Sequence, residues 1–97
     1  MEIQRGLVVQ AKAGRDKGNF FAVLAVDGDV AQIADGRKRR VEKPKHKKLK
    51  HLAATNTLFS EEQFATNNKL HKALYEKGLG RKGTTPQTTT EGGRGFG

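Results

Sequence analysis

Nine of the 19 Lys and Arg residues in this 97-residue chain lie in one short segment, residues 35–52, together with only two acidic residues. That segment carries a net charge of +7, while residues 1–34 and 53–77 are each neutral and residues 78–97 carry +2. Ammonium groups bind phosphate as point charges, and guanidinium groups add bidentate hydrogen bonds and stacking on bases. Cationic charge concentrated in this way predicts contact with the phosphate backbone of a nucleic acid.

The alternative for any charge run is a solvated surface without a partner. Here the density of charge beside a neutral scaffold favours the nucleic acid. Phosphate contacts release condensed counterions, so the binding is expected to depend strongly on salt. The residues of this segment predicted to contact phosphate are Arg37, Lys38, Arg39, Arg40, Lys43, Lys45, Lys47, Lys48 and Lys50.

A second, smaller group of cations lies in a turn bounded by glycines. Arg15 and Lys17 stand between Gly14 and Gly18. We expect both glycines to be structural, because they allow positive backbone φ angles that other residues resist. Arg15 and Lys17 are predicted to contact nucleic acid if the turn lies near the basic segment. Asp16, between them, is of a type that commonly caps turns.

The residue types of most catalytic and metal sites are missing or badly placed. Cys is absent, which excludes disulfides, thiolate chemistry and Cys-based zinc sites. Of the three candidate histidines, His46 and His51 are surrounded by like charges that oppose cation binding, and His71 stands apart from them. No phosphate-binding loop or nucleophile elbow is present. We therefore expect no enzyme activity, metal, cofactor or small-molecule substrate.

The composition indicates one small domain with tails. Apolar residues make up 34% of the chain and the mean hydropathy is −0.74, so the core must be small. Residues 1–5 include no apolar leader segment, and no stretch approaches the roughly 18 apolar residues of a membrane span. The expectation is a cytoplasmic protein without membrane contact that is a monomer when free.

Short apolar runs separated by turns predict a mainly β domain that positions the basic segment. Residues 6–13, 19–26 and 30–34 are expected as strands, and residues 37–42 as a fourth, basic strand. The dipeptide Asp35-Gly36, before the fourth strand, is typical of a type I′ hairpin turn. Antiparallel strands with such short turns favour a small barrel, which leaves few unpaired edges.

After the strands, the pattern predicts an irregular basic arm over residues 43–57 and then a helix that begins at Ser60 and ends before Gly78. An apolar stripe on this helix is expected either to pack on the barrel or to dock a partner; its members are Phe64, Leu70 and Leu74.

The tail and one pair of aromatic residues complete the predictions. Residues 78–97 hold almost no apolar side chains and are predicted to be disordered. Their last six residues, 92–97, faintly resemble an RGG-type RNA-binding segment. Phe20-Phe21 are expected in the core rather than as a platform for base stacking, because they are embedded in an apolar strand.

The stretch from Gly6 through Ala13-Gly14-Arg15-Asp16-Lys17-Gly18 to Val23 resembles the KOW motif, an SH3-like β-barrel element of ribosomal and transcription-elongation proteins. Further matching residues are Asp35-Gly36-Arg37-Lys38-Arg39, Val41-Glu42-Lys43-Pro44-Lys45 and Lys50-His51-Leu52. They resemble the KOW-type large-subunit ribosomal protein number fourteen of archaea and eukaryotes, and the short bacterial KOW domain-containing RNA-binding proteins. Phe20-Phe21 depart from the general motif, which often has another glycine there.

The resemblance covers residues 2–52 and implies an SH3-like (KOW) small barrel that binds RNA, ribosomal RNA above all, with ribosomal proteins as further neighbours. The expected domains are therefore the barrel with its basic arm over 1–52, a linker and helix over 53–77, and the tail over 78–97. Two alternatives stay open: an adaptor that contacts a protein of the ribosome or the transcription machinery, and a sequence-independent nucleic-acid binder.

Overall fold

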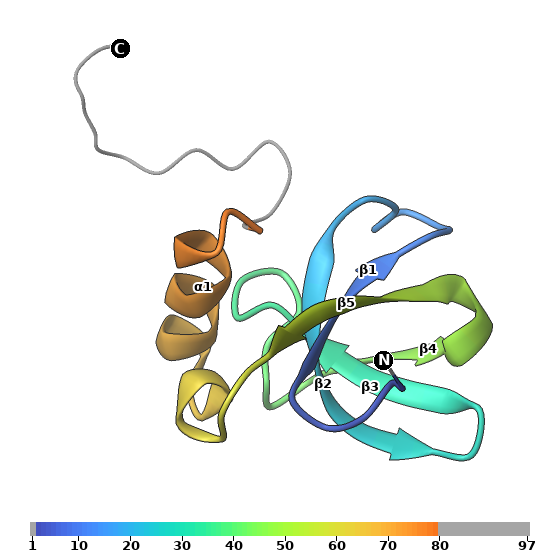
Figure 1. Cartoon of the computed structure of the whole chain (residues 1–97), viewed down its shortest axis with the longest axis horizontal. Coiled ribbons are helices and arrows are strands. Elements are labelled where there is room, and N and C mark those ends of the chain that lie inside the picture. Colours follow the sequence, from blue (N-terminus) through green and yellow to red (C-terminus); the bar gives the residue numbers. More distant parts are fainter. Residues whose placement is uncertain (1, 80–97) are drawn as a thin grey trace, which may run out of the picture.

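The computed structural model describes residues 2–79, which form one antiparallel sheet followed by a helix (Figure 1). The strands stand in the order β4-β3-β2-β1-β5, and each neighbouring pair is antiparallel. The prediction of a mainly β chain with a C-terminal helix is confirmed. Most of the predicted disordered tail lies outside the described residues. The strands are β1 (Leu7–Ala11), β2 (Phe20–Asp27), β3 (Val30–Ala34), β4 (Lys45–Lys48) and β5 (Leu52–Leu58).

The sheet is strongly curled, and the connection between its two outer strands requires this. Only the 3-10 turn η1 (Leu49–His51) separates β4 from β5, although these strands stand at opposite ends of the sheet order. Three residues of 3-10 turn cover about 6 Å. The outer strands of a flat five-stranded sheet would lie about 19 Å apart. The sheet therefore bends so that its edges approach each other, while the described strand pairings include none between β4 and β5.

The curl gives the sheet two buried faces. Alternate residues of β1 and β2, among them Val9 and Phe21, point into a first core enclosed by the sheet. The residues between them, among them Val8 and Ala22, point into a second core that lies under the helix. This explains the nearly continuous apolar sequence of β2, since both faces of the strand need apolar side chains. Phe20 packs partly buried against the second core, as expected for a structural pair with Phe21.

The helical region differs from the single helix that the sequence predicts. It consists of a 3-10 turn, η2 (Glu62–Phe64), and the helix α1 (Asn67–Glu76), whose N-cap is Thr66. Ser60 does donate its N–H to Gln63 Oε1, but the turn that follows is 3-10 and ends before α1 begins. Gly78 ends α1 with φ of 75°, in a Schellman arrangement in which Leu79 N–H donates to Leu74 O.

The apolar stripe of the helical region is used inside the fold. Phe64, Leu70 and Leu74 are all buried in the second core, together with Phe59, which directly follows β5. Of the two roles predicted for this stripe, packing on the sheet is therefore the observed one. No helix within residues 2–79 has the length and apolar character to span a membrane.

The fourth predicted strand and the turn predicted before it are wrong. Residues 37–42 form a loop instead of a strand, and the fourth strand is β4, which begins at Lys45 after Pro44. The loop forms because the Asp35 side chain accepts hydrogen bonds from the backbone N–H groups of Arg37 and Arg39, which replaces the two-residue turn predicted at Asp35-Gly36.

The irregular arm predicted over residues 43–57 is likewise absent. Its second half is β5, which pairs with β1 from Leu7↔Leu58 to Ala11↔Leu52. The sheet therefore extends beyond residue 52, and the expected linker that begins at residue 53 is part of it. The Thr and Ala residues of β5 gave no apolar alternation strong enough to predict a strand.

Candidate nucleic-acid interface

The basic strand β4 lies at the edge of the sheet, and its two faces have different surroundings. Lys45 and Lys47 stand opposite Ile33 and Ala31 of β3, on the side of the first core, and both are partly buried. His46 and Lys48 point to the other side and are exposed. Only half of this strand therefore presents cations outward, because side chains alternate between the faces of a strand.

The glycine-bounded turn lies against the basic segment, which is the condition set for Arg15 and Lys17, and the contact between the two is built on a buried carboxylate. Asp16 is 1% exposed, and its Oδ2 accepts hydrogen bonds from Arg39 Nε at 3.3 Å and Nη2 at 2.9 Å. Lys45 Nζ lies 3.9 Å from the same oxygen. Asp16 thus joins three segments, namely the β1–β2 turn, the β3–β4 loop and β4.

A second link joins the same turn to β4. Lys47 Nζ donates a hydrogen bond of 2.9 Å to Ala13 O, directly before Gly14. Gly14 and Gly18 have φ angles of 82° and 89°, so both occupy the left-handed region that glycine adopts without strain. The turn therefore holds Arg15 and Lys17, both exposed, beside the basic strand.

Two of the cations in the β3–β4 loop contact other side chains of the protein. Arg37 Nη1 lies 3.0 Å from Nε2 of His71 in α1, and Arg40 pairs with Glu42 at 2.8 Å. Hydrogen bonds from Arg40 and Asn67 lower the pKa of Glu42 to about 2. Desolvation, and next the charge of Arg37, lower the pKa of His71, which favours the neutral ring beside the guanidinium.

These contacts divide the eleven predicted phosphate-binding residues into two groups. Five have an internal partner: Arg37, Arg39, Arg40, Lys45 and Lys47. The other six make no side-chain hydrogen bond or ion pair within residues 2–79, and all are exposed; we call them the outer cations. They are Arg15, Lys17, Lys38, Lys43, Lys48 and Lys50.

Sequence reasoning missed the residues that organise this surface. Asp16 was expected only to cap a turn, and Asn67 was given no role, although its side chain contacts the β3–β4 loop. Neither residue has a sequence signal of its own, because each contact joins segments that are distant in the chain.

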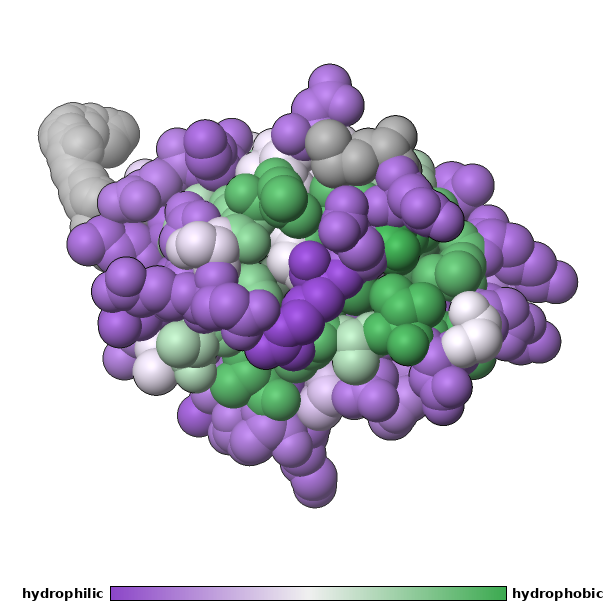
Figure 2. Space-filling model, turned by 60° about the horizontal axis from the view of Figure 1, so that its bottom comes forward, coloured by the Kyte–Doolittle hydropathy of each residue, from purple (hydrophilic) through white to green (hydrophobic). Residues whose placement is uncertain are grey.

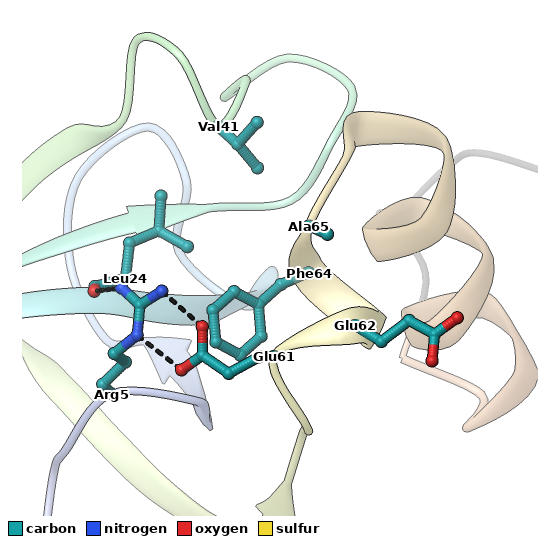
Figure 3. A pocket seen from close by; sticks show the side chains of 7 residues that line it. All are labelled: Arg5, Leu24, Val41, Glu61, Glu62, Phe64 and Ala65. Atoms are coloured by element: carbon teal, nitrogen blue, oxygen red, sulfur yellow. Dashed lines mark hydrogen bonds and ion pairs between the residues drawn. The ribbon is translucent and has the colours of Figure 1, made fainter.

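The basic surface is only one part of the exterior. On the face in Figure 2, apolar side chains gather between hydrophilic ones. The exterior also has a hollow of about 500 Å³, which is lined by Arg5, Leu24, Val41, Glu61, Glu62, Phe64 and Ala65 (Figure 3). Arg5 closes one side of it, since the guanidinium makes a two-fold hydrogen bond with Glu61 and lies 5.0 Å from the Phe64 ring centre. That hydrogen bonding lowers the pKa of Glu61.

No group of three or more His, Cys, Asp or Glu side chains within residues 2–79 is arranged to hold a metal ion.

Among protein-family models, none matches this chain, and a search of curated proteins finds no match either.

Gly36 is predicted to be the least replaceable glycine of this surface. Its φ is 81°, and a Cβ there would collide with the carbonyl oxygen of Asn67 and approach His71 N. Gly36→Ala is expected to lower the free energy of unfolding by more than about 2 kcal/mol, since steric collision adds to the cost of a left-handed alanine. Urea unfolding of this variant and of Gly28→Ala measures the difference. Gly28 has φ of 64°, and a Cβ added there would meet no atom within 4 Å, so equal losses would refute the collision.

Proposed function

We propose that this protein binds structured RNA, with ribosomal RNA as its expected target, through the outer cations and the strand and loops that carry them. The main support for the proposal is the set of contacts made by Asp16. They hold the turn with Arg15 and Lys17 against the basic segment. Six exposed cations without an internal partner among residues 2–79 remain available there for phosphate.

We also propose that the curled sheet is an SH3-like barrel of the KOW type. The supporting observations are the five-stranded antiparallel order and the single 3-10 turn between β4 and β5. The glycine-bounded turn that carries the sequence resemblance lies against β4, where it joins the basic surface.

The proposed mechanism is electrostatic docking of a surface that is already ordered. The cations of the turn, the loop and β4 contact phosphates of an A-form helix, whose shape, phosphates and 2′-hydroxyl groups are the features a protein reads. The cations with internal partners set the backbone geometry around this surface, so little order has to be gained on binding.

The salt dependence of binding tests the proposal. If the six outer cations each engage one phosphate, the plot of log K against log salt is expected to have a slope of roughly −4 to −5. Fluorescence anisotropy with an RNA hairpin at several salt concentrations measures it. A slope near zero would exclude this mechanism. Equal affinity for a DNA hairpin of the same sequence would favour the sequence-independent nucleic-acid binder.

The adaptor alternative has less support. The apolar stripe expected to dock a protein partner is buried against the sheet, so it is not available on the surface. Binding to purified ribosomal proteins that survives high salt would restore this alternative. Crosslinking to RNA in cells, together with sedimentation of the protein with the large ribosomal subunit, would support a ribosomal target.

A further inference from the structure

The β3–β4 loop rests on the first turns of α1 through one asparagine side chain. Asn67 Oδ1 accepts a hydrogen bond of 2.8 Å from Val41 N–H, and Asn67 Nδ2 donates one of 2.7 Å to Glu42 Oε1. Glu42 in turn accepts from Arg40 at 2.8 Å. The Val41 side chain packs partly buried against the second core, beneath the same helix. One residue of α1 therefore fixes the backbone, a carboxylate and a cation at the end of the loop.

The beginning of the loop contacts the same helix. Gly36 approaches the backbone of Asn67 and His71 so closely that a side chain would not fit, and Arg37 reaches the His71 ring. Both ends of the loop are therefore held by α1. Between them lies Lys38, an exposed outer cation.

We propose that α1, acting through Asn67, is a positioning element of the RNA-binding surface. This inference rests on the proposed function and extends it to a part of the chain outside the KOW resemblance. Asn67 does not touch the RNA. It holds the loop in the conformation that presents Lys38 and its basic neighbours, so that the RNA does not have to order the loop on binding.

The expected effect follows from the cost of ordering. Each long side chain that must be immobilised weakens binding, and so does a mobile loop backbone. Without its anchor at Val41 and Glu42, the loop is expected to lose its fixed geometry while the sheet stays folded. Asn67→Ala should therefore bind the RNA hairpin about fivefold to tenfold more weakly. The salt slope should shrink by about one unit as a phosphate contact is lost.

Thr66→Ala is the matched control. Thr66 is the N-cap of α1, and its Oγ1 accepts a hydrogen bond of 3.2 Å from Lys69 N. Its removal weakens the start of the same helix without touching the loop. If Asn67 acted only through the stability of α1, the two variants would lose RNA affinity equally. Positioning requires a larger loss for Asn67→Ala at a temperature where both variants are fully folded.

A rescue experiment separates geometry from charge. Asn67→Asp keeps an acceptor for Val41 N–H but places a second carboxylate against Glu42, so its affinity should fall. Adding Glu42→Gln reverses donor and acceptor in that hydrogen bond and restores the net charge of the wild type. The double variant should recover most of the affinity. Failure of this recovery, together with wild-type affinity in Asn67→Ala, would overturn the inference.

Amide hydrogen exchange keeps this test independent of RNA. The Val41 amide should be protected in the wild type and in Thr66→Ala, and should exchange much faster in Asn67→Ala, because its acceptor is gone. Unchanged protection in Asn67→Ala would refute the anchoring. A different result would separate the two proposals. If the wild-type protein failed to bind RNA, but the Val41 amide still exchanged faster in Asn67→Ala than in the wild type, the proposed function would be wrong and the anchoring of the loop would stand.

Discussion

Arg39→Ala is expected to lower the free energy of unfolding by about 3 kcal/mol, because it breaks a buried ion pair. The Asp16 side chain is 1% exposed and the Arg39 side chain 25% exposed. Removal of Arg39 takes the closer of its two described ion pairs from this buried carboxylate, while Lys45 stays 3.9 Å away. In a domain of this size the loss corresponds to a fall in Tm of roughly 10–20 °C. Thermal and urea unfolding measure it.

Arg40→Ala is the control for this prediction. The Arg40–Glu42 pair has a similar separation, 2.8 Å, but its side chains are 58% and 57% exposed. An exposed pair contributes at most about 1 kcal/mol. Similar losses in Arg39→Ala and Arg40→Ala would contradict the structural role of the buried pair. A double-mutant cycle with Asp16→Asn then isolates the coupling between Asp16 and Arg39.

The triple variant Lys38→Gln/Lys48→Gln/Lys50→Gln is expected to bind the RNA hairpin about a hundredfold more weakly near 0.1 M salt. Its salt slope should shrink by roughly two to two and a half units, half of the slope expected for six phosphate contacts. Because these side chains are exposed and have no internal partner within residues 2–79, stability should change by less than about 0.5 kcal/mol. Anisotropy titrations and thermal unfolding of the same preparations check both parts.

The matched control removes the same charge from the helix. Lys69→Gln/Lys72→Gln/Lys77→Gln alters three exposed lysines in α1 or at its end. If the interface lies where we propose, this variant should retain most of the RNA affinity. Equal weakening by the two triple variants would mean that net charge alone attracts RNA, and the proposed interface would then be incorrect.

The sequence predicted those strands in which apolar side chains dictate the structure. The strands β1, β2 and β3 were expected close to their observed bounds, because their residues fill the two cores. The strand β4 was placed too early, since a run of charged residues has no apolar period that could mark where a strand begins. Its position is decided by pairing with β3, which only the folded chain shows.

The candidate site was predicted as a set of cations but not as an arrangement. Composition located the charge in residues 35–52, and it could not separate Arg39 and Lys47, which have internal partners, from exposed cations such as Lys48. That separation depends on contacts between distant segments, such as Arg39 with Asp16. A prediction from neighbouring residues in the sequence places such side chains in solvent, because it holds no information on the distant groups that pack against them.

The pairing of β5 with β1 sets the order in which this chain can fold during synthesis. The hairpin of β2 and β3 closes over a short turn and needs no other segment. The strand β1 is made first, yet one of its edges has no partner until the ribosome has released the residues up to Leu58. Phe59 and Phe64 follow directly and bring the helical region onto the second core. The basic segment therefore leaves the ribosome before the sheet beneath it is complete.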